Sequence, residues 1–134
     1  MMEIDGGCHC GAIAYRGKIG SPAVGLCHCT DCQNLSGGPY RASVAVDARD
    51  FQITKGTPKV YIKKTADSGR QRAQGFCGEC GSPIYSTDPV KPEAYFVRIG
   101  GIRQRGELKP ARQIWCRSAL PWGLLAGPER IEKD

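Results

Sequence analysis

Three cysteines lie close together in one short stretch of the chain. The segment LCHCTDCQ, residues 26–33, holds Cys27, Cys29 and Cys32, with a histidine and an aspartate between them. Thiolates at this spacing are typical of a zinc site, because zinc prefers soft sulfur ligands. A closed structural zinc site takes four protein ligands, so this group is one short. Either a fourth ligand comes from elsewhere in the chain, or one position on the metal is kept for a substrate.

Four further cysteines form two short pairs, and glycines flank both pairs. Cys8 and Cys10 lie in GGCHCG, and Cys77 and Cys80 lie in FCGECGS. Each pair fits a tight turn that offers two ligands to one metal without strain. We therefore expect a closed, structural zinc site that links the N-terminal part of the chain to its middle. Such a site contributes about 10–16 kcal/mol to folding.

The eighth cysteine decides whether the group of three is closed. Cys116 lies in RQIWCRS, an expected strand, with no second cysteine and no glycine turn beside it. A lone cysteine in such a setting is most often a small buried apolar residue, which is the interpretation we favour. As a fourth ligand it would close the site. Without it, three thiolates hold a second zinc with an open position, the arrangement of catalytic zinc.

The charge of this second site indicates which substrate it suits. Three thiolates more than neutralise Zn²⁺, which makes the metal a weaker Lewis acid than one held by three neutral histidines. Such a metal is poorly suited to making hydroxide from water, but it binds another thiol as a thiolate and keeps it nucleophilic. The open position therefore predicts a thiol substrate, with Cys27, Cys29 and Cys32 as the catalytic ligands.

Polar residues in and after this loop are candidates for further roles. His9 and His28 each lie between two cysteines, and alternation along an extended segment points them away from the metal. We expect both to be spacers that face solvent or form hydrogen bonds, with proton transfer by His28 as the alternative. For Asp31 we favour an Asx turn over a base near the metal. The segment SGG, residues 36–38, either binds a carboxylate or a developing alkoxide or simply forms a tight turn.

These residues need a scaffold that presents them at turns, and the sequence pattern predicts one made of strands. Short runs rich in β-branched and aromatic residues alternate with segments that hold most of the 18 glycines and nine prolines. The expected strands are GAIAYRG, YRASVAV, FQIT, KVYIKK, AYFVRIG and QIWC. One short helical turn is expected at QNLS, after Cys32. We therefore expect a mainly β fold with few or no helices, and with the cysteines at strand ends and turns.

The composition narrows the class of protein. The chain fits a single domain, residues 1–134, and its 40% hydrophobic and 24% charged residues are ordinary for a globular protein. We expect no membrane segment, because no apolar run is long enough to cross a bilayer. Acidic residues in MMEIDGGCHC stand where a secretory signal carries basic ones, so we expect a cytoplasmic protein whose reduced thiols bind metal. The net charge of +6 would attract an anionic small molecule or a nucleic acid.

The order of the cysteine groups resembles the glutathione-dependent formaldehyde-activating (GFA) family, whose eukaryotic relatives include centromere protein V. The segments that carry the resemblance are GGCHCGAIAY, CHCTDCQNLSGGPY, FCGECGSPIY and IWCRSALPW. The resemblance implies small β-sheets in a β-tent arrangement, two zinc ions per chain, and addition of glutathione to formaldehyde, formally a carbon–sulfur lyase reaction in reverse. It assigns the structural zinc to Cys8, Cys10, Cys77 and Cys80, and the catalytic zinc to Cys27, Cys29 and Cys32.

The chain departs from the family near the expected substrate site. The family often has basic residues where this chain has Gln33 and Asn34, and a histidine where it has Gln113. These changes leave the metal ligands intact and bear on the substrate. We expect an enzyme that adds glutathione, or another low-molecular-weight thiol, to formaldehyde or a similar small aldehyde.

The alternative is a non-catalytic two-zinc module whose basic surface binds nucleic acid or a protein. Nucleic acid is the less favoured partner, because the chain has no basic helix and only 7% aromatic residues for stacking on bases.

Overall fold

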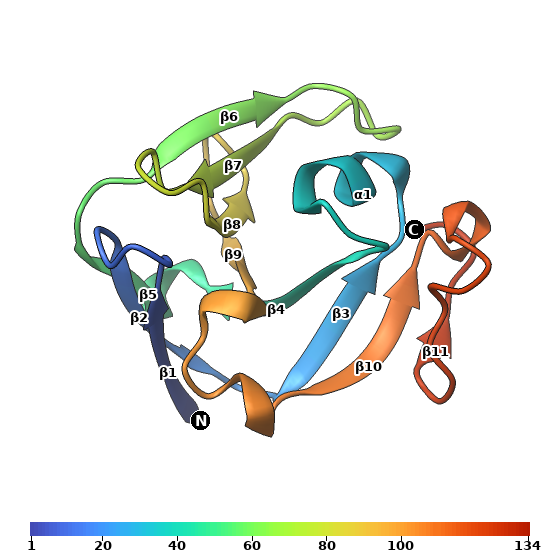
Figure 1. Cartoon of the computed structure of the whole chain (residues 1–134), viewed down its shortest axis with the longest axis horizontal. Helices are drawn as coiled ribbons and strands as arrows, with labels where there is room; N and C mark the ends of the chain where they lie inside the picture. Colours follow the sequence, from blue (N-terminus) through green and yellow to red (C-terminus); the bar gives the residue numbers. More distant parts are fainter.

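The computed structural model describes residues 1–134, and its strands form two sheets (Figure 1). The smaller sheet has the antiparallel order β1–β2–β5. Its strands are β1 (Met2–Gly7), β2 (Ala14–Ile19) and β5 (Phe51–Lys55). The turn between β1 and β2 contains Cys8 and Cys10, so this hairpin positions the first cysteine pair.

The larger sheet has eight strands, in the order β11–β10–β3–β4–β9–β8–β7–β6. Its strands are β3 (Ala23–Cys27), β4 (Arg41–Asp47), β6 (Lys59–Lys63), β7 (Arg72–Phe76), β8 (Pro83–Thr87), β9 (Ala94–Arg98), β10 (Lys109–Ile114) and β11 (Glu129–Arg130). β10 runs parallel to both β3 and β11, and every other pair in this sheet is antiparallel. The fold is therefore mainly β, as the sequence predicts.

The apolar core contains residues from both sheets. Burial alternates along β2, so that Tyr15 and Ile19 are buried while Arg16 and Lys18 are exposed. Buried side chains of β3, β4 and β9 belong to the same cluster, including the fully buried Val97. This two-residue period is what a strand with one covered face requires. Burial of this apolar surface is the main stabilising contribution to such a fold.

The single α-helix, α1 (Thr30–Ser36), lies in the connection between β3 and β4 (Figure 1). The sequence predicts only one turn at QNLS, whereas the helix begins earlier and includes Cys32. Its N-terminus is capped by Cys29, whose Sγ accepts the amide of Cys32 at 3.3 Å. Its C-terminus is capped by Gly37, which adopts the left-handed conformation at φ 71°. Neither this helix nor any 3₁₀ turn has the length and apolar character needed to cross a membrane.

The strand expected at QIWC ends earlier than predicted. β10 stops at Ile114, and Trp115 adopts a left-handed backbone with φ 57°. Cys116 then begins a 3₁₀ turn, Cys116–Ser118, so it lies outside the strand. Its amide donates to the carbonyl oxygen of Ile131 at 3.0 Å, which joins this turn to the segment after β11.

Candidate metal centres

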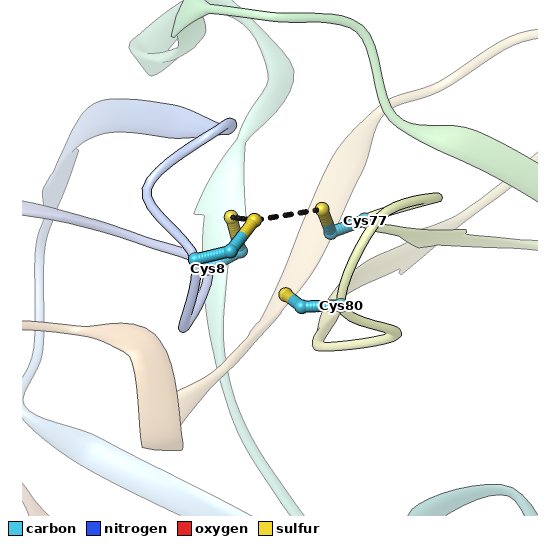
Figure 2. Close-up of side chains that lie close together, drawn as sticks. Cys8, Cys77 and Cys80 are labelled. Atoms are coloured by element: carbon cyan, nitrogen blue, oxygen red, sulfur yellow. Dashed lines mark hydrogen bonds between the residues drawn. The ribbon is translucent and has the colours of Figure 1, made fainter.

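The two cysteine pairs meet at one point, although they lie far apart in the sequence. The Sγ atoms of Cys8, Cys10, Cys77 and Cys80 all lie within 4.8 Å of one another. Cys10 Sγ is 3.7 Å from both Cys8 Sγ and Cys77 Sγ. Figure 2 shows Cys8 approaching Cys77 and Cys80 from a facing turn. A tetrahedral zinc with Zn–S bonds of about 2.3 Å requires S···S separations of about 3.8 Å. This sulfur group therefore has the dimensions of a four-thiolate zinc site.

The two turns that carry these pairs are built alike. In the first, Gly11 donates its amide to Cys8 O at 3.2 Å and has φ 83°. In the second, Gly81 donates to Cys77 O at 2.8 Å and has φ 79°. Glycine is favoured at both positions because a side chain makes this conformation costly. The amide of His9 donates to Ser82 Oγ at 3.1 Å and joins the two turns directly.

Hydrogen bonds to sulfur favour the thiolate form of two members of this group, Cys8 and Cys80. Cys8 Sγ accepts the amide of Ile13 at 3.1 Å. The hydroxyl of Ser82, 3.2 Å from Cys80 Sγ, and the nearby amide of Ser82 lower the pKa of Cys80 to about 5. Because a thiol must lose its proton to ligate a metal, these donors prepare the site for a cation.

The second group is formed by Cys27, Cys29 and Cys32, whose Sγ atoms also lie within 4.8 Å of one another. Cys27 ends β3, Cys29 caps α1, and Cys32 is a buried residue of that helix. The end of the strand, the helix cap and the first turn of the helix thus bring three sulfurs together on one side of the position that a metal would occupy. No further cysteine, histidine or carboxylate belongs to this group.

Its electrostatics differ from those of the first group. The thiols of Cys27 and Cys32 donate toward Cys29 and lower its pKa to about 2. The same interaction with Cys29, followed by that with Cys32, raises the pKa of Cys27. The other two thiols thus favour the thiolate form of Cys29, which suits capture of a soft divalent cation.

Cys116 belongs to neither group. Its side chain is buried, and Sγ donates to the carbonyl oxygen of Gln113 at 3.5 Å. These surroundings are those of the small buried residue that the sequence predicts.

His28 is a buried, hydrogen-bonded spacer. Its Nε2 lies 2.9 Å from Gln113 Oε1, and its ring forms an edge-to-face pair with the ring of Tyr40. Gln33 supports the same loop, because its Nε2 donates to His28 O at 2.8 Å and to Ser118 O at 3.0 Å. No direct sequence signal predicted these roles of Gln33 and Gln113, although both positions depart from the family pattern.

Asp31 does not form the Asx turn that we favoured from the sequence. The cap of α1 is supplied by Cys29, so the carboxylate of Asp31 is free to turn toward the segment after β6. Its Oδ2 accepts the hydroxyl of Thr65 at 2.7 Å and pairs with Lys63 Nζ at 3.2 Å. The carboxylate therefore attaches this segment to α1.

The segment SGG forms a tight turn, one of the two alternatives for residues 36–38. Ser36 Oγ accepts the amide of Gly38 at 3.3 Å and donates to Tyr40 O at 3.2 Å. These local bonds direct the chain from α1 into β4.

Comparison with known proteins adds a family and a fold. The family model described as glutathione-dependent formaldehyde-activating enzyme matches residues 3–118. A Halomonas elongata protein, named "Putative glutathione-dependent formaldehyde-activating enzyme", is 30% identical over 96 residues, which cover 69% of this chain and 60% of that protein. A Schizosaccharomyces pombe protein, named an uncharacterized lyase, is 26% identical over 102 residues, which cover 72% of this chain and 66% of that protein. The chain thus spans less than two thirds of the length of both relatives.

A solved structure shares the fold. The crystal structure of a Rhodobacter sphaeroides protein aligns with a TM-score of 0.59 at 21% identity. The alignment covers 74% of this chain and 87% of that one.

Proposed function

The chain belongs to the glutathione-dependent formaldehyde-activating enzyme family, and on that basis we propose that it is a zinc-dependent, carbon–sulfur lyase-type enzyme. Its substrates are a low-molecular-weight thiol, glutathione, and formaldehyde or a similar small aldehyde. In the reaction, the thiol sulfur bonds to the aldehyde carbon while the carbon–oxygen π bond breaks. The proton of the thiol ends on the oxygen, which leaves a hydroxymethyl thioether.

The observation that carries the proposal is the three-sulfur group of Cys27, Cys29 and Cys32. Four-coordinate zinc bound by three protein ligands keeps one position for a substrate, whereas the four-sulfur group is complete by itself. When bound by these thiolates, zinc would hold a thiol substrate as its nucleophilic thiolate at neutral pH. The three cysteines are thus the catalytic ligands.

The protein's own residues keep this group rigid. Cys27 is fixed by its pairing with Arg41 across β3 and β4, and Cys32 is buried within α1. The bonds of Gln33 to His28 O and Ser118 O restrain the loop between them. A ligand set held in this way loses little conformational freedom on metal binding, which favours affinity.

The four-sulfur group has a structural role in this proposal. It joins the β1–β2 hairpin of the small sheet to the β7–β8 hairpin of the large one. Zinc bound there would make residues 1–134 a single zinc-binding domain. The proposal includes a cytoplasmic location, because a reducing compartment keeps cysteines available as metal ligands.

Zinc content and rate measured together test the proposal. The wild-type protein should bind two zinc ions per chain and accelerate thiol–formaldehyde adduct formation above the uncatalysed background. Cys29→Ser should lose one zinc and the acceleration while staying folded. Cys116→Ser is the matched control, since the same substitution outside both groups should keep both zincs and the rate. A wild-type protein with one zinc per chain, or a Cys116→Ser protein that loses its second zinc, would overturn the proposal.

A further inference from the structure

A cavity of about 780 Å³ opens beside Cys8 of the four-sulfur group. Its lining includes Cys8, His9 and residues of α1, β4, β7, β8 and the end of β9. Its volume is within the range of about 300–1,000 Å³ that is usual for small-molecule sites. The cavity can therefore enclose a ligand the size of a short peptide.

The lining of this cavity is basic and has no acidic counterpart. Four arginines are among its 22 lining residues, and no aspartate or glutamate is. The arginines are Arg41, Arg98, Arg103 and Arg105. Only Arg103 has a carboxylate partner, Asp5, which lies outside the lining. A concave surface with one sign of charge concentrates ligands of the opposite sign.

Arg98 is buried without a carboxylate. The residue is only 7% exposed, and its guanidinium donates to neutral oxygens of Ser43, Phe96 and Gln74. Burial, together with the nearby charge of Arg41, lowers the pKa of Arg98 to about 9. Buried cations are normally paired with an anion, so this guanidinium lacks its usual partner.

Gln74 has a donor with nothing to donate to. Its Oε1 accepts from Arg98 at 2.9 Å and from Arg41 at 3.2 Å, which fixes the orientation of the amide, because the opposite orientation would face donors with donors. Its Nε2 is then a buried donor without a hydrogen-bond partner. Two guanidinium groups and one unpaired amide N–H therefore meet at the wall of the cavity, and all three favour an oxyanion.

This wall lies next to the three-sulfur group. Arg41 is the register partner of Cys27 across β3 and β4, and Arg98 follows across β4 as the partner of Ser43. The three cysteines do not line the cavity themselves. A carboxylate held by the wall would thus lie beside the sulfur group while the rest of its ligand occupies the cavity.

We propose that Arg41, Arg98 and Gln74 form a carboxylate-binding site for the thiol substrate, an inference that rests on the proposed function. Ionic hydrogen bonds to a carboxylate would supply the anion that Arg98 lacks and the acceptor that Gln74 Nε2 lacks. The site selects thiols that carry a carboxylate at a distance from sulfur, and it disfavours neutral or cationic thiols. The rival explanation is that the two arginines only offset the negative charge of the cysteine thiolates.

S-methylglutathione is the probe that separates the two explanations, because its capped sulfur cannot bind zinc as a thiolate. Calorimetric titration of the zinc-loaded wild-type protein should show binding, and the dimethyl ester of the same compound should bind about tenfold more weakly or worse. Equal affinity of acid and ester, or no binding of the acid, would overturn the proposal.

Gln74→Glu is the decisive variant. The new carboxylate would pair with both arginines from within, so the variant should be as thermally stable as the wild type, or more so, and keep its zinc. Its affinity for S-methylglutathione should fall about tenfold or more, because the site is already neutralised and repels a second carboxylate. Gln52→Glu is the matched control, since Gln52 also accepts from an arginine, Arg16, but on the outside of the small sheet. Its affinity should be unchanged.

Arg41→Gln is a second variant, which removes a positive charge from the site where Gln74→Glu adds a negative one. Its affinity for S-methylglutathione should also fall about tenfold, whereas Arg49→Gln, which removes an exposed arginine, should not change it. A lower zinc content with unchanged affinity in Arg41→Gln would favour the rival explanation and overturn the proposal.

Failure of this inference differs from failure of the proposed function. If the wild-type protein accelerates adduct formation but Gln74→Glu binds S-methylglutathione as tightly as the wild type, only the carboxylate site is ruled out. Binding of S-methylglutathione that depends on Gln74, in a protein with no rate above background, would instead remove the proposed reaction.

Discussion

His28 and Gln113 form a fully buried hydrogen bond, with 2.9 Å between Nε2 and Oε1, although they lie 85 positions apart. Gln113 also accepts the amide of Leu125 and donates to Leu125 O, both at 2.9 Å. Gln113 Oε1 is an acceptor, so His28 Nε2 is the donor in this bond. The amide of Gln113 thus connects the three-sulfur loop to β10 and to the C-terminal segment.

Gln113→Met should destabilise the protein without removing zinc. The substitution leaves the buried donors of His28 and Leu125 unpaired, at a cost of about 2–4 kcal/mol in the free energy of unfolding. Urea unfolding of the zinc-loaded protein measures this cost. Gln52→Met removes an exposed amide and serves as control. Equal unfolding free energies for the two variants would show that the buried network contributes nothing.

The cysteines that could hold metal could be predicted from the sequence because they come in short local sets, two pairs and one group of three. Cys8 with Cys10, and Cys77 with Cys80, are close in sequence and flanked by glycines, so spacing alone indicates a ligand turn. The mainly β fold could be predicted for a similar reason, since period-two alternation along β2 and β4 is visible in the sequence. Both signals come from neighbouring residues.

Other features could not be predicted, because they depend on register between distant strands. β7 and β8 have the sequences RAQGF and PIYST, in which polar residues, glycine and proline hide the strand pattern. Arg41, Gln74 and Arg98 come from three strands that meet only once the sheet order is known. The start of the helix could not be predicted either, because its N-cap is a cysteine, Cys29, and not one of the usual capping residues. The helix is therefore longer than the single turn expected at QNLS.

Loss of the four-sulfur metal should affect folding more than loss of the three-sulfur metal. Cys77→Ser keeps the size of a buried side chain but removes a ligand that joins the two sheets. Because zinc contributes about 10–16 kcal/mol to the folding of small zinc domains, the thermal midpoint should fall by about 10 °C or more. Cys29→Ser, which also loses one zinc, is the comparison and should show a smaller shift. The reverse order, measured by circular dichroism, would contradict the structural role.

Asp31→Asn should lower stability and leave catalysis nearly unchanged. Lys63, whose side chain is only 11% exposed, would lose its acidic partner, while the asparagine oxygen can still accept from Thr65. We expect a loss of about 1–3 kcal/mol in the free energy of unfolding, and a rate of adduct formation whose pH profile matches the wild type. Asp47→Asn, whose partner Arg49 is 87% exposed, should change stability little. A rate that falls by orders of magnitude in Asp31→Asn would make Asp31 a catalytic base.

Gly75→Ala should be costly because Gly75 lies against the ring of Tyr85 on the neighbouring strand β8. A Cβ added at Gly75 would clash with Tyr85 Cζ, and that ring also contacts Phe51 and Tyr95, so it has little room to move. The expected loss is about 1–3 kcal/mol in the free energy of unfolding.

A double-mutant cycle identifies the cause. In a Tyr85→Leu background the same change at Gly75 should cost at least about 0.5 kcal/mol less, since the clashing ring is gone. Gly25→Ala is the matched control within β3, because a Cβ there has no heavy atom within 4 Å, and it should be close to neutral. If Gly75→Ala costs the same with and without Tyr85, the glycine is required for its backbone and not for the approach of the ring.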